Sequence, residues 1–139
     1  MSGIETVIVF GVRYHRKSDI DKIVDRSYNV KHVTGPESNN LFDFANITGM
    51  DDGFQNYIET KGRWSNTRDQ IELDNYKTIA IYCNKGRHRS VSCAELLKKR
   101  WPQIQIKYLD QKYWYDLMRL ATYVVSTTAT LRRQQPHED

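Results

Sequence analysis

Cysteine is scarce in this sequence, and its scarcity sets the first limit on what the chain can be. The 139 residues contain only two cysteines, Cys83 and Cys93, too few for a disulfide framework. Their spacing with His88 matches no common zinc pattern, so we expect no metal site and no cofactor. A chain of this kind is typical of a reducing compartment, and we expect a cytoplasmic protein.

Long apolar runs are missing as well. No stretch approaches a transmembrane span, and the first residues lack the pattern of a signal peptide, so we expect no membrane partner. The phosphate-binding pattern G-x-x-x-x-G-K-[ST] is also absent. With 39% hydrophobic and 12% aromatic residues, the length suits one globular core. We predict a single domain over residues 1–131 and a disordered polar tail over 132–139.

Positive charge is in modest excess and is concentrated. The formal net charge is +4, from 21 basic and 17 acidic residues. One short stretch holds four basic side chains, those of Lys85, Arg87, His88 and Arg89. Clustering of this kind favours an anionic partner, such as a phosphate group or a nucleic acid.

Apolar residues follow two patterns that alternate along the chain, one typical of strands and one typical of helices. Runs rich in β-branched residues predict strands at residues 6–10, 78–82 and 104–109. Apolar stripes predict helices that open at Asp51 or Asp52 and that cover 69–76, 91–100 and 111–126. Residues 22–25 fit a short helix or a strand. Alternation of strands and helices predicts an α/β fold, a single layer of mainly parallel sheet flanked by helices.

The stretch from Cys83 to Ser90 lies between a predicted central strand and a predicted helix. A helix N-terminus offers unpaired N–H groups and the positive end of its dipole, and arginines grip phosphate oxygens as planar forks. We therefore predict a phosphate-binding loop. Its expected ligand-binding residues are Asn84, Lys85, Gly86, Arg87, His88, Arg89 and Ser90, with Arg13, which follows the first strand, as a second cationic wall.

Cys83, Gly86, Arg89 and Ser90 also satisfy the pattern C-x-x-G-x-x-R-S, which resembles the phosphate loop of cysteine-dependent phosphatases. In that interpretation the Cys83 thiolate attacks phosphorus and Arg89 holds the oxygens. Asp51 or Asp52 would protonate the leaving group, although either is also an ordinary helix cap. The alternative is phosphate binding without turnover.

The same loop resembles the C-x-G-G-x-H-R-S-V loop of the C-terminal domain of the RNase adapter RapZ family, with Lys85 in place of the first glycine. Three further blocks follow the order of that family. Residues 10–14 resemble its S-F-G-[YF]-[KR]-Y-G stretch, residues 19–25 its D-A-D-x-V-F-D strand, and residues 47–58 its L-T-G-x-D-x-x-V-x-x-Y-V helix start. The resemblance covers roughly residues 6–110.

This resemblance implies a domain that binds an amino-sugar phosphate and small regulatory RNAs. By position it points to Asp25, Lys85, Gly86, His88 and Arg89 as pocket residues, and it favours a strand at residues 22–25. The chain departs from the family after Asp25, where the prolines are missing, and it keeps only Asp110 of a His-Arg-Asp triplet. Because the family's nucleotide-binding domain is absent, we expect a stand-alone, divergent relative.

Three functions from different classes remain open at this point. The first is binding of a phosphorylated small molecule, such as an amino-sugar phosphate, or of RNA. The second is a cysteine phosphatase, which predicts turnover that Cys83→Ser abolishes. The third is an interaction module for a phosphorylated partner, whose binding depends on Arg89. A homo-oligomer is compatible with each of the three.

Overall fold

Four parallel strands form the centre of the fold. The computed structural model describes residues 3–114, and in it the strands lie in the order β2-β3-β1-β4. They are β1 (Thr6–Gly11), β2 (Arg26–Asn29), β3 (Thr78–Cys83) and β4 (Gln105–Tyr108). The two central strands, β1 and β3, are the apolar β-branched runs that the sequence marks most clearly. The α/β fold with a parallel sheet is thus confirmed.

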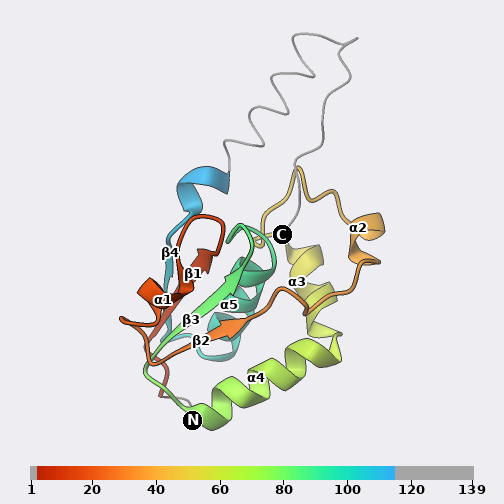
Figure 1. Ribbon diagram of the computed structural model, residues 1–139. Coiled ribbons are helices and arrows are strands. Elements are labelled where there is room, and N and C mark those ends of the chain that lie inside the picture. The colour runs from red at the N-terminus through yellow and green to blue at the C-terminus, as the bar shows by residue number, and fades with distance from the viewer. Residues whose placement is uncertain (1–2, 115–139) are drawn as a thin grey trace.

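Helices cover the sheet unequally. The helices are α1 (Lys17–Ile20), α2 (Ser38–Leu41), α3 (Asp52–Glu59), α4 (Gly62–Asp74) and α5 (Arg89–Arg100). Figure 1 shows α3, α4 and α5 on one side of the sheet and the short α1 on the other. The larger core cluster lies under the three longer helices, and a smaller one, which includes Ile20, lies on the opposite face.

Side chains of β3 divide between these two clusters by alternation. Ile79, Ile81 and Cys83 belong to the larger cluster, whereas Ala80 and Tyr82 belong to the smaller one. This is the period of two expected of a strand buried on both faces. The thiol of Cys83 therefore lies on the side of the sheet that α5 covers.

Two elements differ from their sequence-based predictions. Helix α4 begins at Gly62, whereas the sequence predicted a loop up to residue 67 and a helix only from 69. Residues 22–25 form turns, neither helix nor strand, and β2 begins at Arg26. The strand at 22–25, which the resemblance to the family favoured, was wrong, because the extended segment that pairs with β3 begins only at Arg26. The strand in this part of the chain is β2, a polar edge strand in which Tyr28 is the one buried residue.

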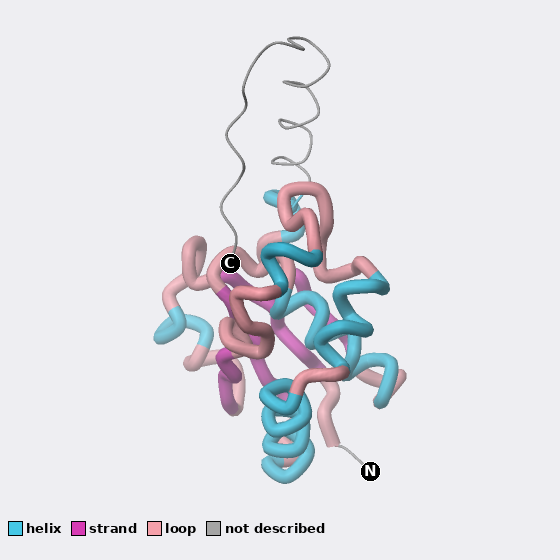
Figure 2. Tube along the Cα trace, turned by 90° about the vertical axis from the view of Figure 1, so that its right-hand side faces the viewer, coloured by secondary structure: helices cyan, strands magenta, loops and turns pink. Residues whose placement is uncertain are grey.

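The carboxyl ends of β1, β3 and β4 gather at one edge of the sheet, at the top in Figure 1. The segments that follow these strands therefore meet there, which is the usual place for a ligand in a parallel sheet. Figure 2 shows the same loops from the side, at the end of the sheet away from the N-terminus. Among residues 3–114, no helix is long and apolar enough to cross a membrane. The expected helix over 111–126, apart from its first turn, and the expected tail lie outside the described residues.

Candidate anion-binding site

The loop between β3 and α5, residues 84–88, runs across the end of β1 and is called the β3–α5 loop here. Val12 and Arg13 donate backbone N–H groups to the carbonyls of Cys83 and Asn84, at 3.0 and 2.9 Å. These bonds continue the β1–β3 ladder beyond the strands. They join the segment after β1 to the loop, and they place Arg13, a predicted site residue, beside it.

Gly86 is the residue that allows the loop to lie so close to β1. Its φ is +63°, in the left-handed region that other residues rarely adopt. A Cβ on Gly86 would lie 2.7 Å from the backbone nitrogen of Gly11, and a Cβ on Gly11 would lie 2.6 Å from the backbone nitrogen of Gly86. Both positions therefore require glycine, because the two backbones touch without room for a side chain.

All the basic side chains of this stretch are buried. Lys85 is 5% exposed, Arg87 2%, His88 0% and Arg89 5%. Arg87 donates a hydrogen bond to the carbonyl of Ala45 at 2.9 Å. Three of these side chains, those of Lys85, Arg87 and Arg89, are cationic, so the loop and the start of α5 bring several buried positive charges into one part of the fold.

Arg89 reaches across to the segment before α2. Its Nε donates to Thr34 Oγ1 at 2.9 Å, and its guanidinium lies over the ring of Phe44, 5.6 Å from the centroid. Thr34 carries no sequence signal that would have assigned it to the site. Its contact with Arg89 spans 55 residues of chain, so only the folded structure shows it.

His88 connects the loop to the segment before α3. Its Nε2 lies 2.8 Å from the carbonyl of Phe44 and 2.9 Å from that of Ile47. Carbonyl oxygens only accept, so this nitrogen must hold a proton and donate. These contacts hold the ring of His88 against the segment before α3, and its predicted phosphate contact stays a prediction.

The segment that leads into α3 is packed directly on the loop. Gly49 donates its N–H to the carbonyl of Arg87 at 2.7 Å, and a Cβ on Gly49 would lie 2.4 Å from the carbonyl oxygen of His88. Two residues later, Asp51 accepts a hydrogen bond from the N–H of Phe54 at 2.8 Å and caps α3. The side chain of Asp52 is 89% exposed.

Cys83 and Ser90 face each other beneath the loop. The Cys83 Sγ and the Ser90 Oγ are 2.9 Å apart, and both residues are fully buried. Either atom is able to donate in this contact. The neighbouring thiol, that of Cys93, is also fully buried, and this burial raises its pKa well above the usual value.

Asp110 and His15, a pair to which the sequence assigned no role in the site, lie against the loop. Asp110, which follows β4, is 1% exposed and lies 2.7 Å from His15 Nε2. Its other oxygen accepts the N–H of Gly11 at 2.7 Å. Trp114 donates its indole N–H to the carbonyl of Gly86 at 2.9 Å. The position of Asp110 just after a strand, at the edge where strand ends meet, was the signal that pointed to it.

Asp25 does not join this group. Its carboxylate accepts the N–H of Thr78, the first residue of β3, at 3.0 Å. Asp25 therefore lies at the amino ends of the strands, whereas the β3–α5 loop follows their carboxyl ends. The sequence placed Asp25 at the carboxyl end of a strand, and this was wrong because β2 begins after Asp25.

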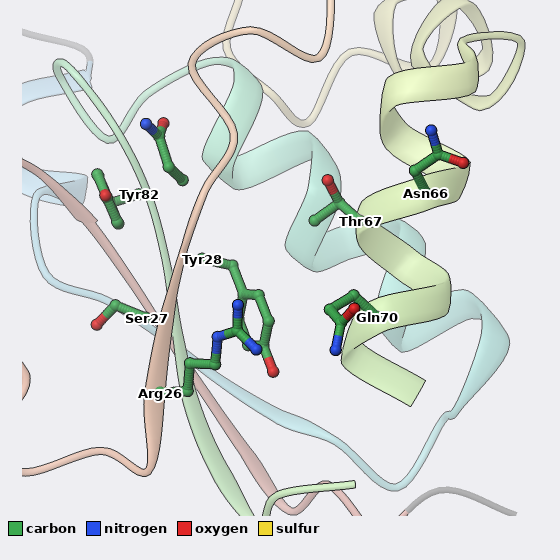
Figure 3. Close-up of a pocket in the computed structure, with 8 residues that line it drawn as sticks. Arg26, Ser27, Tyr28, Asn66, Thr67, Gln70 and Tyr82 are labelled. Carbon is green, nitrogen blue, oxygen red and sulfur yellow. The ribbon is translucent and has the colours of Figure 1, made fainter. Parts of the chain in front are cut away.

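A separate open cleft of about 400 Å³ lies between β2 and α4. Figure 3 shows Arg26 and Tyr28 from β2 on one side and Thr67 and Gln70 from α4 on the other. Polar groups here are tied together by Asp74, which accepts hydrogen bonds from Arg26, Tyr28 and Gln70. We read this network as the link that holds α4 to the edge strand. No residue predicted for the site lines this cleft, and among residues 3–114 no group of His, Cys, Asp and Glu is placed to hold a metal ion.

Fold and site together define a parallel α/β domain with a buried basic loop between β3 and α5. Comparison with known families matches residues 5–112 to the RapZ C-terminal domain. The chain therefore belongs to this family.

Curated relatives agree with that assignment. A nucleotide-binding protein of Clostridium perfringens is 34% identical over 107 residues, which are 68% of this chain and 34% of that protein. A nucleotide-binding protein of Acinetobacter baylyi is 26% identical over 122 residues, 76% of this chain and 41% of that protein. The chain thus spans between a third and two fifths of the length of these relatives.

Proposed function

We propose that the β3–α5 loop binds the phosphate group of a phosphorylated ligand, a sugar phosphate or an RNA. The observation that supports this most is the burial of three basic side chains close together in the sequence, Lys85 and Arg87 in the loop and Arg89 as the first residue of α5. Hydrogen bonds from charged donors to an anion are stronger in such a buried setting than in water. Membership of the RapZ C-terminal domain family, whose curated relatives are named nucleotide-binding proteins, agrees with a ligand of this class.

The backbone contributes to the proposed site as well. Where Gly86 and Gly11 touch, no side chain stands between the loop and the end of the sheet. The main-chain N–H groups that an anion would meet are those at the start of α5, directly after the loop, as in other sites at the start of a helix. Arg89, the first residue of α5, is the most suitable fork for two phosphate oxygens.

Calorimetric titration of inorganic phosphate, glucosamine-6-phosphate and a short structured RNA would test this proposal. We expect Arg89→Ala to weaken binding about 10- to 100-fold, the usual effect of losing a charge-assisted hydrogen bond. Arg89→Lys should recover part of the loss, since it keeps the charge and not the fork. Arg100→Ala is the control, because Arg100 is an exposed cation at the other end of α5.

The sugar phosphate and the RNA distinguish a site for a small metabolite from a site for a nucleic acid. Binding of the sugar phosphate alone would identify a metabolite site. Binding of RNA with an affinity that falls steeply with salt would identify a nucleic-acid site. If neither probe nor inorganic phosphate binds to the folded wild type, or if Arg89→Ala binds as well as Arg100→Ala, the proposal is refuted.

A cysteine phosphatase is the second candidate, and the contact between Cys83 and Ser90 favours it. A hydroxyl 2.9 Å from the thiol sulfur is placed to stabilise a thiolate. Hydrolysis of a small aryl phosphate, followed from pH 5 to pH 8, would decide this question. Turnover by the wild type that is lost in Cys83→Ser would establish an enzyme, with Asp51 or Asp52 as the acid to examine next. Absence of turnover in both proteins leaves a binding site.

A further inference from the structure

Asp110 makes two hydrogen-bonded contacts at the end of the sheet, beside the β3–α5 loop. Its Oδ2 accepts the N–H of Gly11, and its Oδ1 pairs with His15 Nε2, both at 2.7 Å. The same Oδ2 fills the space beside Gly86, because a Cβ added to Gly86 would lie only 2.7 Å from it. One buried carboxylate is therefore bonded to Gly11 and leaves no room for a side chain at Gly86, at the point where the loop crosses β1.

The residues around this carboxylate reinforce the same arrangement. Trp114, one helical turn after Asp110, donates to the carbonyl of Gly86 at 2.9 Å. The segment of residues 110–114 thus holds Gly86 from two sides. His15 is kept in place by its own N–H bond to the carbonyl of Gly11 at 3.1 Å and by the edge of the Phe10 ring.

We infer that Asp110, paired with His15, is a positioning residue for anion binding by the β3–α5 loop. This inference rests on the proposed function. Asp110 does not touch the anion in this account. It fixes Gly11 and Gly86 against each other, and so it fixes the loop geometry that presents backbone N–H groups and cations to the ligand.

The chemistry of the carboxyl group gives the sign of the pH effect. Burial raises the pKa of Asp110, while the Gly11 N–H, His15 and, more weakly, Lys112 act in the opposite direction. Lys85, beside Gly86, is the neighbouring charge on the loop. Asp110 therefore takes up a proton at a higher pH than an ordinary carboxyl group. A protonated carboxyl is a weaker acceptor for the Gly11 N–H, so anion affinity should fall as the pH drops through this step.

Amide NMR on the ¹⁵N-labelled full chain tests the positioning contact without any ligand. The Gly11 amide resonance of the wild type should move as Asp110 takes up a proton, at a higher pH than an exposed carboxyl group would. His15→Gln keeps a donor but removes the imidazole, and the step should then lie at a higher pH. Asp110→Asn should abolish the step. A Gly11 resonance that titrates identically in Asp110→Asn would overturn the inference.

Sulfate titration over the pH range of this step tests the effect on the site. Sulfate stays a dianion over this range, so a change of affinity with pH comes from the protein and not from protonation of the ligand. We expect the wild-type affinity to fall at the pH of the Gly11 step, and Asp110→Asn to bind about tenfold more weakly with no such step. Asp69→Asn, an exposed carboxylate on α4, is the control and should behave as the wild type.

The outcomes separate this inference from the proposed function. Sulfate binding that is equal in wild type and Asp110→Asn, with no step, refutes the role of Asp110 and leaves the phosphate site intact. Failure of the folded wild type to bind sulfate at any pH refutes both. If Asp110→Asn does not fold, His15→Gln is the deciding variant. The inference then requires its sulfate affinity to fall at a higher pH than that of the wild type.

Discussion

Replacement of Gly86 by alanine is the sharpest test of how the β3–α5 loop is built. The loop passes over β1 with Gly86 at φ +63°, and no atom of a side chain separates it from Gly11. Alanine adds one methyl group and changes nothing else. Any loss of stability therefore reports on the backbone conformation and the closeness of this crossing.

Two terms give the expected size of the loss. A left-handed conformation costs a residue with a Cβ about 1 to 2 kcal/mol. The new Cβ would also lie 2.7 Å from both Gly11 N and Asp110 Oδ2, and 2.9 Å from the carbonyl carbon of Phe10. Two of these neighbours are backbone atoms that cannot swing away, and overpacking of this kind costs about 1 to 3 kcal/mol. We expect Gly86→Ala to lower the free energy of unfolding by about 2 to 5 kcal/mol.

Urea unfolding followed by circular dichroism would measure this loss. Gly62→Ala provides the matched control, since a Cβ on Gly62, in the first turn of α4, would meet nothing within 4 Å. That variant should be neutral or stabilised by up to about 1 kcal/mol. If Gly86→Ala loses less than about 1 kcal/mol with an unchanged denaturant slope, the close crossing of the two backbones is wrong.

Three further predictions concern other parts of the fold. Asp51→Ala should lower the free energy of unfolding in urea by about 1 kcal/mol, because it removes the cap on the Phe54 N–H. Phosphate affinity should not change, and a large loss of affinity would assign Asp51 to the site. The hydrogen bond from Tyr28 lowers the pKa of Asp74, so the stability of the fold should fall as the pH drops through that lowered pKa. Acid unfolding curves should show a smaller loss of stability for Tyr28→Phe. Burial raises the pKa of the Cys93 thiol, so an aromatic disulfide reagent should label Cys93 only in denaturant, and fast labelling of the native protein would contradict its burial.

The sequence predicted the elements whose own residues decide their structure. Strands β1 and β3 are apolar on both faces, and their predicted bounds agree with the structure to within one residue. Helix α4 was missed over its first two turns because only Trp64 and Ile71 are buried along it, too few for a clear helical period. Its structure comes from packing against the sheet, which no local pattern records.

For the site, the sequence predicted which loop to examine but not what surrounds it. A glycine and three cations between a strand and a helix are a local pattern, and this pattern alone carries the prediction of an anion site at the loop. The contacts that hold it come from far along the chain: Gly11 and Asp110 are 99 residues apart, and Thr34 and Arg89 are 55 apart. Such pairs become visible only when the strand order brings their segments to one edge of the sheet.

Side chains along β3 point alternately to the two faces of the sheet, and this decides where the sulfur of Cys83 lies. Its position bears on whether the β3–α5 loop could hydrolyse a phosphate ester or only bind one. Cys83 shares a face with Ile79 and Ile81, so its sulfur points into the layer under α5 and is fully buried. A nucleophile must come within about 3 to 3.5 Å of phosphorus, in line with the leaving oxygen. Hydrolysis would require the sulfur of Cys83 to reach phosphorus, so this thiol would first have to be uncovered. The proposed binding of an anion by the β3–α5 loop requires no contact with the sulfur. This difference is the physical reason for ranking phosphate binding above phosphatase activity.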